Sequence, residues 1–134
     1  MKYLLDTNIC IYIIKKHPEN VLKKFKSLKL GEVGISSITL AELMYGVYKS
    51  QHQQKNKSAL QEFILPLEIK PFNDEAAEHY GMIRAHLEKE GKLIGALDLM
   101  IAAQAQSLHT TLVTNNKKEF MRVPKLKIED WVHG

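Results

Sequence analysis

Short apolar runs alternate along the chain with longer segments whose hydrophobic residues recur at helical spacing. The short runs predict strands at residues 2–6, 33–36, 68–72, 111–114 and 126–128. The longer segments predict helices at residues 8–16, 18–29, 38–49, 52–65, 74–90, 96–108 and 117–121. Because strands and helices alternate from end to end, the pattern predicts an α/β fold whose parallel sheet is covered by helices on both faces.

Two of these helices have distinctive sequences. Asn73 is the expected N-cap of helix 74–90, Asp74 and Glu75 follow in its first turn, and Gly91 is expected to end it. Residues 96–108 are rich in Ala, Leu and Ile and carry a single charged side chain, that of Asp98. This composition predicts a buried helix that packs closely against its neighbours.

Composition narrows the class of protein. A chain of 134 residues, with 45% hydrophobic and 25% charged residues, fits a single domain over residues 1–134. One cysteine, Cys10, excludes an internal disulfide and a cysteine-based zinc site, and we expect it in the core. No apolar run is long enough to span a membrane, and Asp6 interrupts the only apolar stretch that resembles a signal peptide. We therefore expect a cytoplasmic protein that does not associate with membranes.

The net charge of +4 is unevenly distributed. Residues 1–30 carry seven Lys and two acidic residues, and residues 111–127 carry five basic residues and one Glu. Residues 31–110 are net acidic. Basic segments near both chain ends can attract a polyanion, although solvated helix faces give the same pattern.

Four carboxylates follow predicted strands or begin predicted helices: Asp6, Glu42, Asp98 and Glu119. If the predicted strands are right, all four project from the same edge of the sheet, where parallel α/β folds bind ligands. Carboxylates gathered there repel one another unless a cation lies among them. Oxygen ligands favour Mg²⁺ or Mn²⁺ over zinc, and such an ion can activate water and stabilise charge on a phosphate.

Each carboxylate also has a purely structural interpretation. Asp6 and Asp98 suit helix N-termini, Thr39 and Glu42 fit a capping box, and Glu119 fits an exposed surface. Other chemistries find less support, because the chain has neither a glycine-rich phosphate loop nor a His-Glu-x-x-His zinc helix, and its six histidines show no ligand spacing.

Five segments resemble the PIN domains, and most of all the VapC-type toxins of bacterial toxin–antitoxin modules. They are residues 4–8 (LLDTN), 35–43 (ISSITLAEL), 94–103 (IGALDLMIAA), 112–120 (LVTNNKKEF) and 123–131 (VPKLKIEDW). The resemblance implies a three-layer α/β/α PIN-like fold with a five-stranded parallel sheet. It also implies a Mg²⁺- or Mn²⁺-dependent endoribonuclease that acts on transfer RNA, with the anticodon loop of initiator tRNA as the expected target. A homodimer is expected to be held inactive by a VapB antitoxin in a hetero-oligomer, which reaches operator DNA only through the antitoxin.

The resemblance also implies roles for individual residues. The family's acidic positions correspond to Asp6, Glu42 and Asp98, and to a fourth position between Asn116 and Glu119. Many PIN domains carry Asp where this chain has Asn116, so Glu119 is the expected replacement. We expect Asp6 and Asp98 to bind the metal directly, Glu42 to act through water, and Glu119 to support a second metal or the attacking water.

Further residues are expected to support this chemistry. Those expected to hold the carboxylates or contact the phosphate are Thr7, Asn8, Thr114, Asn115 and Asn116. Those expected to neutralise backbone phosphates are Lys15, Lys16, Lys117 and Lys118. Two alternatives stay open: a degenerate PIN domain that binds RNA without cutting it, and a structure-specific DNA nuclease of the same fold.

Overall fold

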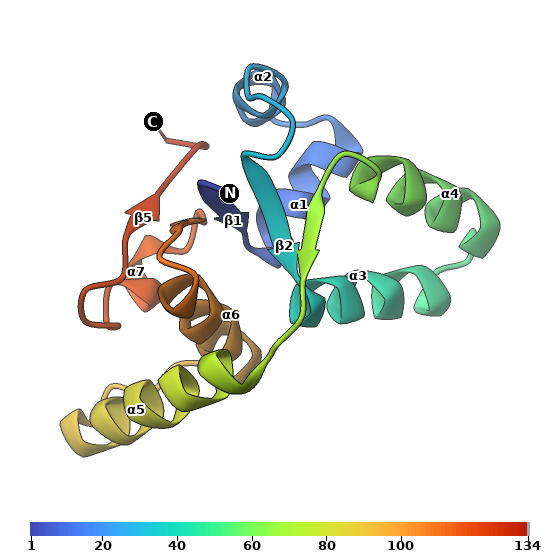
Figure 1. The fold of residues 1–134 in the computed structure, drawn as a ribbon. Helices are drawn as coiled ribbons and strands as arrows, with labels where there is room; N and C mark the ends of the chain where they lie inside the picture. The colour runs from blue at the N-terminus through green and yellow to red at the C-terminus, as the bar shows by residue number, and fades with distance from the viewer. Residues whose placement is uncertain (134) are drawn as a thin grey trace.

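A computed structural model describes residues 1–133, which form five strands and seven helices (Figure 1). The strands are β1 (Tyr3–Leu5), β2 (Val33–Ser36), β3 (Glu68–Lys70), β4 (Thr111–Val113) and β5 (Ile128–Glu129). The helices are α1 (Thr7–Lys15), α2 (Glu19–Lys26), α3 (Ser37–Lys49), α4 (Gln53–Ile64), α5 (Asp74–Glu90), α6 (Ala96–Ser107) and α7 (Lys117–Phe120). All strand pairs are parallel, in the order β3-β2-β1-β4-β5. The predicted five-stranded parallel sheet is confirmed.

The predicted element boundaries differ from the structure mainly at two places. β5 begins at Ile128 rather than 126, because the register pairs Ile128 with Leu112 of β4 and leaves residues 126 and 127 outside the ladder. Helix α2 ends at Lys26, well before the predicted end at residue 29, and Gly31 lies in the following loop with φ of 89°. Helix α5 begins and ends as predicted, between Asn73 and Gly91.

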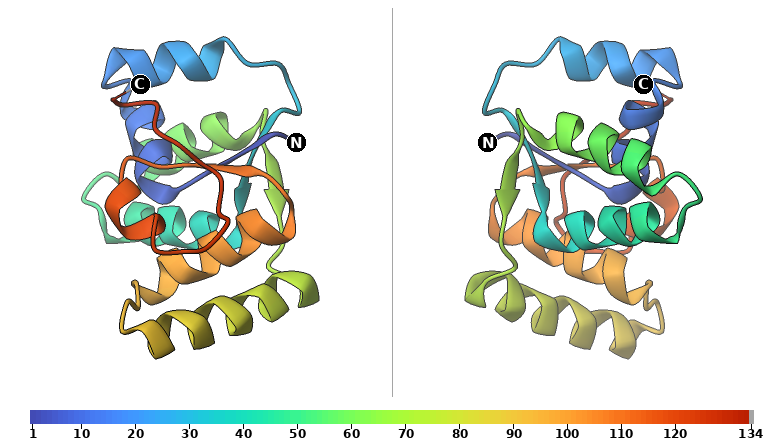
Figure 2. Two further views of the ribbon diagram at one scale, coloured as in Figure 1. Left: turned by 90° about the vertical axis from the view of Figure 1, so that its left-hand side faces the viewer. Right: turned by 90° about the vertical axis from the view of Figure 1, so that its right-hand side faces the viewer.

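The strand residues alternate between two hydrophobic cores, one on each face of the sheet. Tyr3 and Leu5 of β1 face the core that contains Cys10 and the apolar sides of α1 to α4. Leu4 of β1 and Leu112 of β4 face the other core, made with α5, α6 and α7. Figure 2 shows the resulting layers, with α5 and α6 together below the sheet and α2 at the top. The predicted three-layer α/β/α architecture is therefore confirmed.

Gln104, in the middle of the buried helix α6, links three elements at the edge of the sheet. Its side-chain amide donates to the carbonyl oxygens of Lys70 (3.1 Å) and Pro71 (2.8 Å) after β3. Its carbonyl oxygen accepts a hydrogen bond of 2.5 Å from Ser36, whose hydroxyl also caps α3 by accepting from the Ile38 amide. Because α3 carries Glu42 and α6 carries Asp98, these bonds orient two of the helices that supply the carboxylates.

The order of the strands reverses between β1 and β4. The chain first builds outward from β1 through β2 to β3, and then crosses to the other side of β1 with β4 and β5. In an open parallel sheet, a crevice forms where neighbouring connections leave in opposite directions, at the carboxyl ends of the strands. Asp6 and Thr114 directly follow the two strands at this point. No helix in the described part of the chain is long and apolar enough to span a membrane.

Candidate active site

Asp6 is buried at the end of β1, with only 4% of its surface exposed. Its carboxylate caps helix α1 by accepting a 2.9 Å hydrogen bond from the backbone amide of Ile9. The pKa of Asp6 is raised to about 6, chiefly by burial and also by the nearby charge of Glu42, although hydrogen bonds from Thr114 and from backbone amides act in the opposite direction. The predicted helix cap is therefore real, and the carboxylate that forms it is costly to ionise.

Glu42 lies one turn inside α3 and points towards α1. Its Oε1 accepts a 2.6 Å hydrogen bond from the hydroxyl of Thr7, the first residue of α1. The predicted capping box between Thr39 and Glu42 is wrong, because α3 begins at Ser37 and its N-cap is Ser36, three residues before Thr39. The hydroxyl of Thr39 is buried without a hydrogen-bond partner. Glu42 is thus turned towards Asp6 rather than back onto its own helix.

Asp98 lies in the first turn of α6 and Glu119 in α7. The pKa of Asp98 is raised to about 7, chiefly by burial and also by the nearby charges of Glu119, Asp6 and Glu42 and a hydrogen bond with Glu119. The N-cap of α6 is Gly95, which has no side chain to cap the helix, and Asp98 is the acidic residue of the first turn. The predicted position of Asp98 at a helix N-terminus is therefore confirmed, but its side chain bonds to another carboxylate, that of Glu119.

Two neutral groups hold Glu119 in place. Its Oε1 accepts a 2.9 Å hydrogen bond from the backbone amide of Gly95, and its Oε2 accepts one of 2.8 Å from the side-chain amide of Asn116. These bonds, with the Gly95 amide foremost, lower the pKa of Glu119, and the nearby charge of Arg122 lowers it further. Glu119 is therefore the carboxylate of this pair that ionises first, and Asn116 acts as its support.

Gly95 lies between the two helices that carry Asp98 and Glu119. A Cβ atom at this position would lie 3.7 Å from Glu119 Oε1 and 3.9 Å from Asp98 Oδ2. The backbone of Gly95 thus lies against both carboxylates. The sequence alone did not identify Gly95 or Arg122 as part of this site. Gly95 had two signals in the sequence: its position immediately before a buried helix, and its place in the segment 94–103 that resembles the PIN domains.

The structure therefore brings together the four carboxylates expected from the sequence. The charges of Asp6 and Glu42 both raise the pKa of Asp98, which is possible only at short range. Within residues 1–133, no ion pair joins a Lys, Arg or His side chain to any of the four. The site is a concentration of negative charge without a matching cation from the chain.

This donor set suits a hard divalent cation by its chemistry. All candidate ligands are carboxylate oxygens, two of them have pKa values raised by burial and mutual repulsion, and a cation would relieve both effects. No three His, Cys, Asp or Glu side chains in residues 1–133 already surround one point. Asp98 and Glu119 would have to exchange their mutual hydrogen bond for the ion. The half-buried position of Asp98 and the partial exposure of Glu119 leave room for that rotation.

Some of the predicted supporting residues hydrogen-bond within or near the site, and one, Asn8, is exposed. Thr114 is buried and its hydroxyl hydrogen-bonds to Asp6. The same hydroxyl accepts a 2.9 Å hydrogen bond from the backbone amide of Asn116. The side-chain amide of Asn115 donates a 2.9 Å hydrogen bond to the hydroxyl of Tyr12. Its side-chain carbonyl oxygen is buried and has no hydrogen-bond partner within residues 1–133. Asn8, by contrast, is exposed on the first turn of α1. Thr114 therefore positions Asp6, whereas Asn115 fastens β4 to α1.

The four predicted phosphate-binding lysines lie in different places. Lys15 and Lys16 are at the far end of α1, about 13 Å from Asp6 at the usual helical rise. The Nζ of Lys117 lies 3.9 Å from Oδ2 of Asp130, so this lysine already faces a carboxylate of the chain. Lys118 is exposed on α7 beside Glu119. Their contact with RNA remains a prediction, and Lys118 is the best placed of them.

Comparisons with known proteins show the family to which this chain belongs. The PIN domain family model matches residues 3–126. The chain is 48% identical to Ribonuclease VapC2 of Rickettsia felis, over 98% of both chains. It is 44% identical to the tRNA(fMet)-specific endonuclease VapC of Shigella flexneri, again over 98% of both. The crystal structure of DNA-bound VapBC from Salmonella typhimurium contains a chain that superposes with a TM-score of 0.93 at 44% identity, covering 98% of each chain.

The fold and the carboxylate site define a PIN-type nuclease. This chain belongs to the PIN-domain family and, within it, to the VapC ribonucleases.

Proposed function

We propose that this chain is the toxin of a toxin–antitoxin pair and cuts transfer RNA in a reaction that requires Mg²⁺ or Mn²⁺. The observation that carries the proposal is the group formed by Asp6, Glu42, Asp98 and Glu119, which has no cation partner from residues 1–133. A nuclease must bring a polyanion to such a group, and only a cation between them makes that favourable. The name of the Shigella relative supports initiator tRNA as the substrate, and we infer cleavage in its anticodon loop.

The chain's own residues have distinct parts in this reaction. Asp6 and Asp98, the two carboxylates with raised pKa values, would hold the ion directly. A bound Mg²⁺ or Mn²⁺ supplies activation of water and stabilisation of charge on the phosphate. Glu42, oriented by Thr7, faces the same space and can accept a proton from water. Glu119, held by Gly95 and Asn116, stays ionised and can orient water or hold a second ion.

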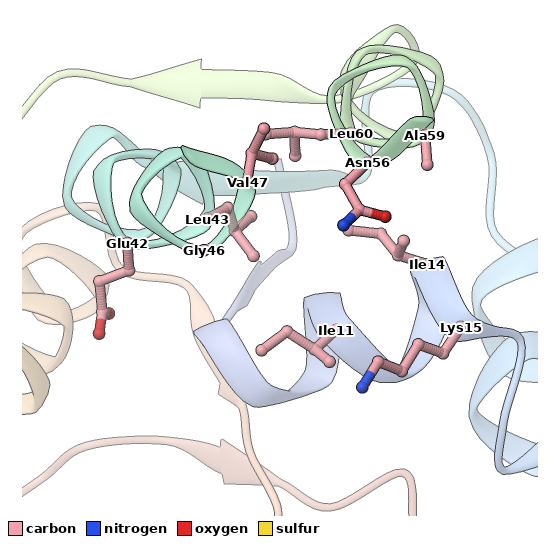
Figure 3. A pocket seen from close by; sticks show the side chains of 10 residues that line it. All are labelled: Ile11, Ile14, Lys15, Glu42, Leu43, Gly46, Val47, Asn56, Ala59 and Leu60. Atoms are coloured by element: carbon pink, nitrogen blue, oxygen red, sulfur yellow. The ribbon is translucent and has the colours of Figure 1, made fainter. Parts of the chain in front are cut away.

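An apolar pocket next to the site supports a VapB-type antitoxin as the partner. The pocket has a volume of about 330 Å³ and lies between α1, α3 and α4 (Figure 3). It is lined by Ile11, Ile14, Leu43, Val47 and Leu60, and Glu42 stands at one end of it. A peptide that places apolar side chains in this pocket would therefore extend towards the carboxylates. The VapBC complex of Salmonella typhimurium supports the same pairing, and any contact with operator DNA would be made by the antitoxin.

End-mapping of RNA fragments tests the cleavage proposal. The purified chain is incubated with total tRNA in Mg²⁺, in Mn²⁺ and in EDTA, beside the Asp98→Asn variant. We expect one dominant cut, in the anticodon loop of initiator tRNA, with either metal and no cut in EDTA or with the variant. Binding without cutting in both metals would favour the degenerate RNA-binding domain. Cleavage of single-stranded DNA in preference to tRNA would favour the DNA nuclease.

A further inference from the structure

A second charged region lies immediately beside the carboxylates and has the opposite sign. Lys92, Lys118 and Arg122 line an open pocket of about 470 Å³, together with Gly91 and Met121. Lys92 comes from the segment between α5 and α6, whereas Lys118 and Arg122 come from α7 and the residues after it. In the left view of Figure 2, α7 lies directly above the start of α6. Three cations from two segments that are distant in sequence therefore converge at one place.

Hydrogen bonds hold the two sides of this basic pocket together. The guanidinium of Arg122 donates a 3.2 Å hydrogen bond to the carbonyl oxygen of Leu93, next to Lys92. The Gly95 amide donates to Glu119, next to Lys118. The second bond belongs to the carboxylate site itself. The pocket is thus attached to the site through Glu119 and Gly95, and its distance from the carboxylates is set by the same contacts.

The cations of this pocket have no full ionic partner in the described part of the chain. None of Lys92, Lys118 and Arg122 forms an ion pair there, whereas the neighbouring Lys117 lies 3.9 Å from Asp130. Arg122 is near enough to Glu119 to lower its pKa without contacting it. Exposed cations without an ion-pair partner attract an anionic group, and a phosphate diester is the anion that an adjacent nuclease site would receive.

We propose that this basic pocket binds a backbone phosphate of the RNA next to the bond that is cut. The inference rests on the proposed function and extends it, because it separates binding of the strand from the chemistry. Lys92 and Lys118 bind the flanking phosphate from two sides, and Arg122 orients the segment that carries Lys92. The strand is thereby directed across Glu119 towards Asp98, so that the neighbouring phosphate meets the carboxylates.

RNA binding without cleavage tests the pocket directly. Bulk tRNA is titrated in EDTA, at several salt concentrations, with wild type, Lys92→Gln/Lys118→Gln, and a control, Lys23→Gln/Lys26→Gln. The control removes the same charge from exposed lysines of α2, which lies on the other face of the sheet. We expect the pocket variant to bind about tenfold more weakly, and the slope of log K against log salt to fall by about 1 for each lysine lost. The control should keep the wild-type slope.

Equal losses in the two double variants would show that only net charge matters and would overturn the proposal, as would unchanged tRNA binding in the pocket variant. In Mg²⁺, the pocket variant should raise KM for tRNA while kcat stays near wild type. An unchanged KM would also contradict the pocket. This test stands apart from the proposed function, because a wild-type protein that binds tRNA through the pocket but never cuts it would refute the nuclease and leave the phosphate site intact.

Discussion

Asp6 and Glu42 are held by neutral groups of the scaffold, whereas Asp98 depends on another carboxylate. Asp6 accepts from the Ile9 amide and Glu42 from the Thr7 hydroxyl, so both are oriented before any ligand arrives. Asp98 shares a hydrogen bond with Glu119. Three of the carboxylates are thus oriented by neutral groups, whereas Asp98 depends on the hydrogen bond that it shares with Glu119.

This difference indicates how the site tolerates its own charge. Four ionised carboxylates at close range repel one another by several kcal/mol at an effective dielectric constant near 20 (about 3 kcal/mol per pair at 5 Å). The Asp98–Glu119 half avoids this cost by keeping a proton on Asp98, whose pKa is about 7, while Glu119 is ionised. We therefore expect the Asp98 half to respond most strongly to metal, pH and substitution.

The largest effect is expected from Asp98→Asn. The amide is nearly the same shape, and it removes a ligand that no scaffold group replaces. Loss of several kcal/mol of metal-derived stabilisation predicts a fall in tRNA cleavage of about a thousandfold. Single-turnover cleavage in Mg²⁺ measures it, with circular dichroism to show that the fold persists. A folded Asp98→Asn protein with full activity would remove Asp98 from the site.

The next prediction concerns stability against pH in EDTA. The pKa of Asp6 is raised to about 6 from a usual value of 3.8, chiefly by burial, so the folded protein binds a proton more tightly than the unfolded chain does. Stability from this group is present in full below pH 3.8 and is lost as the pH rises through about 6. Between pH 5 and 7.5, Asp6 should lower the free energy of unfolding by about 1–2 kcal/mol, and half-buried Asp98 should add to that fall.

Urea denaturation at the two pH values measures this loss. Asp6→Asn should remove the contribution of Asp6 and flatten the dependence, whereas Glu62→Gln, at an exposed carboxylate of α4, should leave it unchanged. Glu119 and Asp130 do not interfere, because their lowered pKa values leave them ionised throughout this range. A wild-type protein that is equally stable at both pH values would show that Asp6 is not desolvated as described.

A smaller effect distinguishes Glu119 from Asn116. Glu119→Gln removes the charge that shares a proton with Asp98, and we expect at least a tenfold loss of cleavage. Asn116→Ala removes one hydrogen bond to Glu119 while the Gly95 amide still holds it, so a loss of about fivefold or less is expected. Cleavage rates at saturating Mg²⁺ compare the two. The opposite order would place the fourth functional position at Asn116.

The sequence predicted the two halves of the site unequally, and for physical reasons. Asp6 follows an apolar strand and precedes a helix, a local pattern that shows both its cap and its place at the sheet edge. The support of Glu119 by Gly95 joins residues 24 positions apart and leaves no local pattern. Glu42 shows the limit of local rules, because its Thr7 partner is 35 residues away, while the capping box with Thr39 was a nearer but wrong choice.

The same distinction applies to the fold. The elements and their three-layer arrangement could be predicted because each depends on hydrophobic periodicity within a short segment. Gln104 could not, because a single glutamine in an apolar helix gives no indication of its partners. Its bonds to Ser36, Lys70 and Pro71 form only once β2, β3 and α6 have come together. Its tertiary role therefore follows from the assembled sheet rather than from its own segment.

The smallest expected effect separates the two roles of Asp6, as a helix cap and as a metal ligand. Asn caps a helix nearly as well as Asp, whereas Ala does not cap, so in EDTA Asp6→Asn should be about 1 kcal/mol more stable than Asp6→Ala. That difference should be the same in Mg²⁺, because neither side chain has the carboxylate. A saturating ion bound only by the folded state should add about 2–3 kcal/mol to wild type, and both variants should lose most of this gain. Thermal melts of the three proteins in EDTA and in Mg²⁺ measure both quantities. Equal stability of the two variants in EDTA would argue against Asp6 as a helix cap. If Mg²⁺ stabilised Asp6→Asn as much as it stabilises wild type, that would argue against Asp6 as a metal ligand.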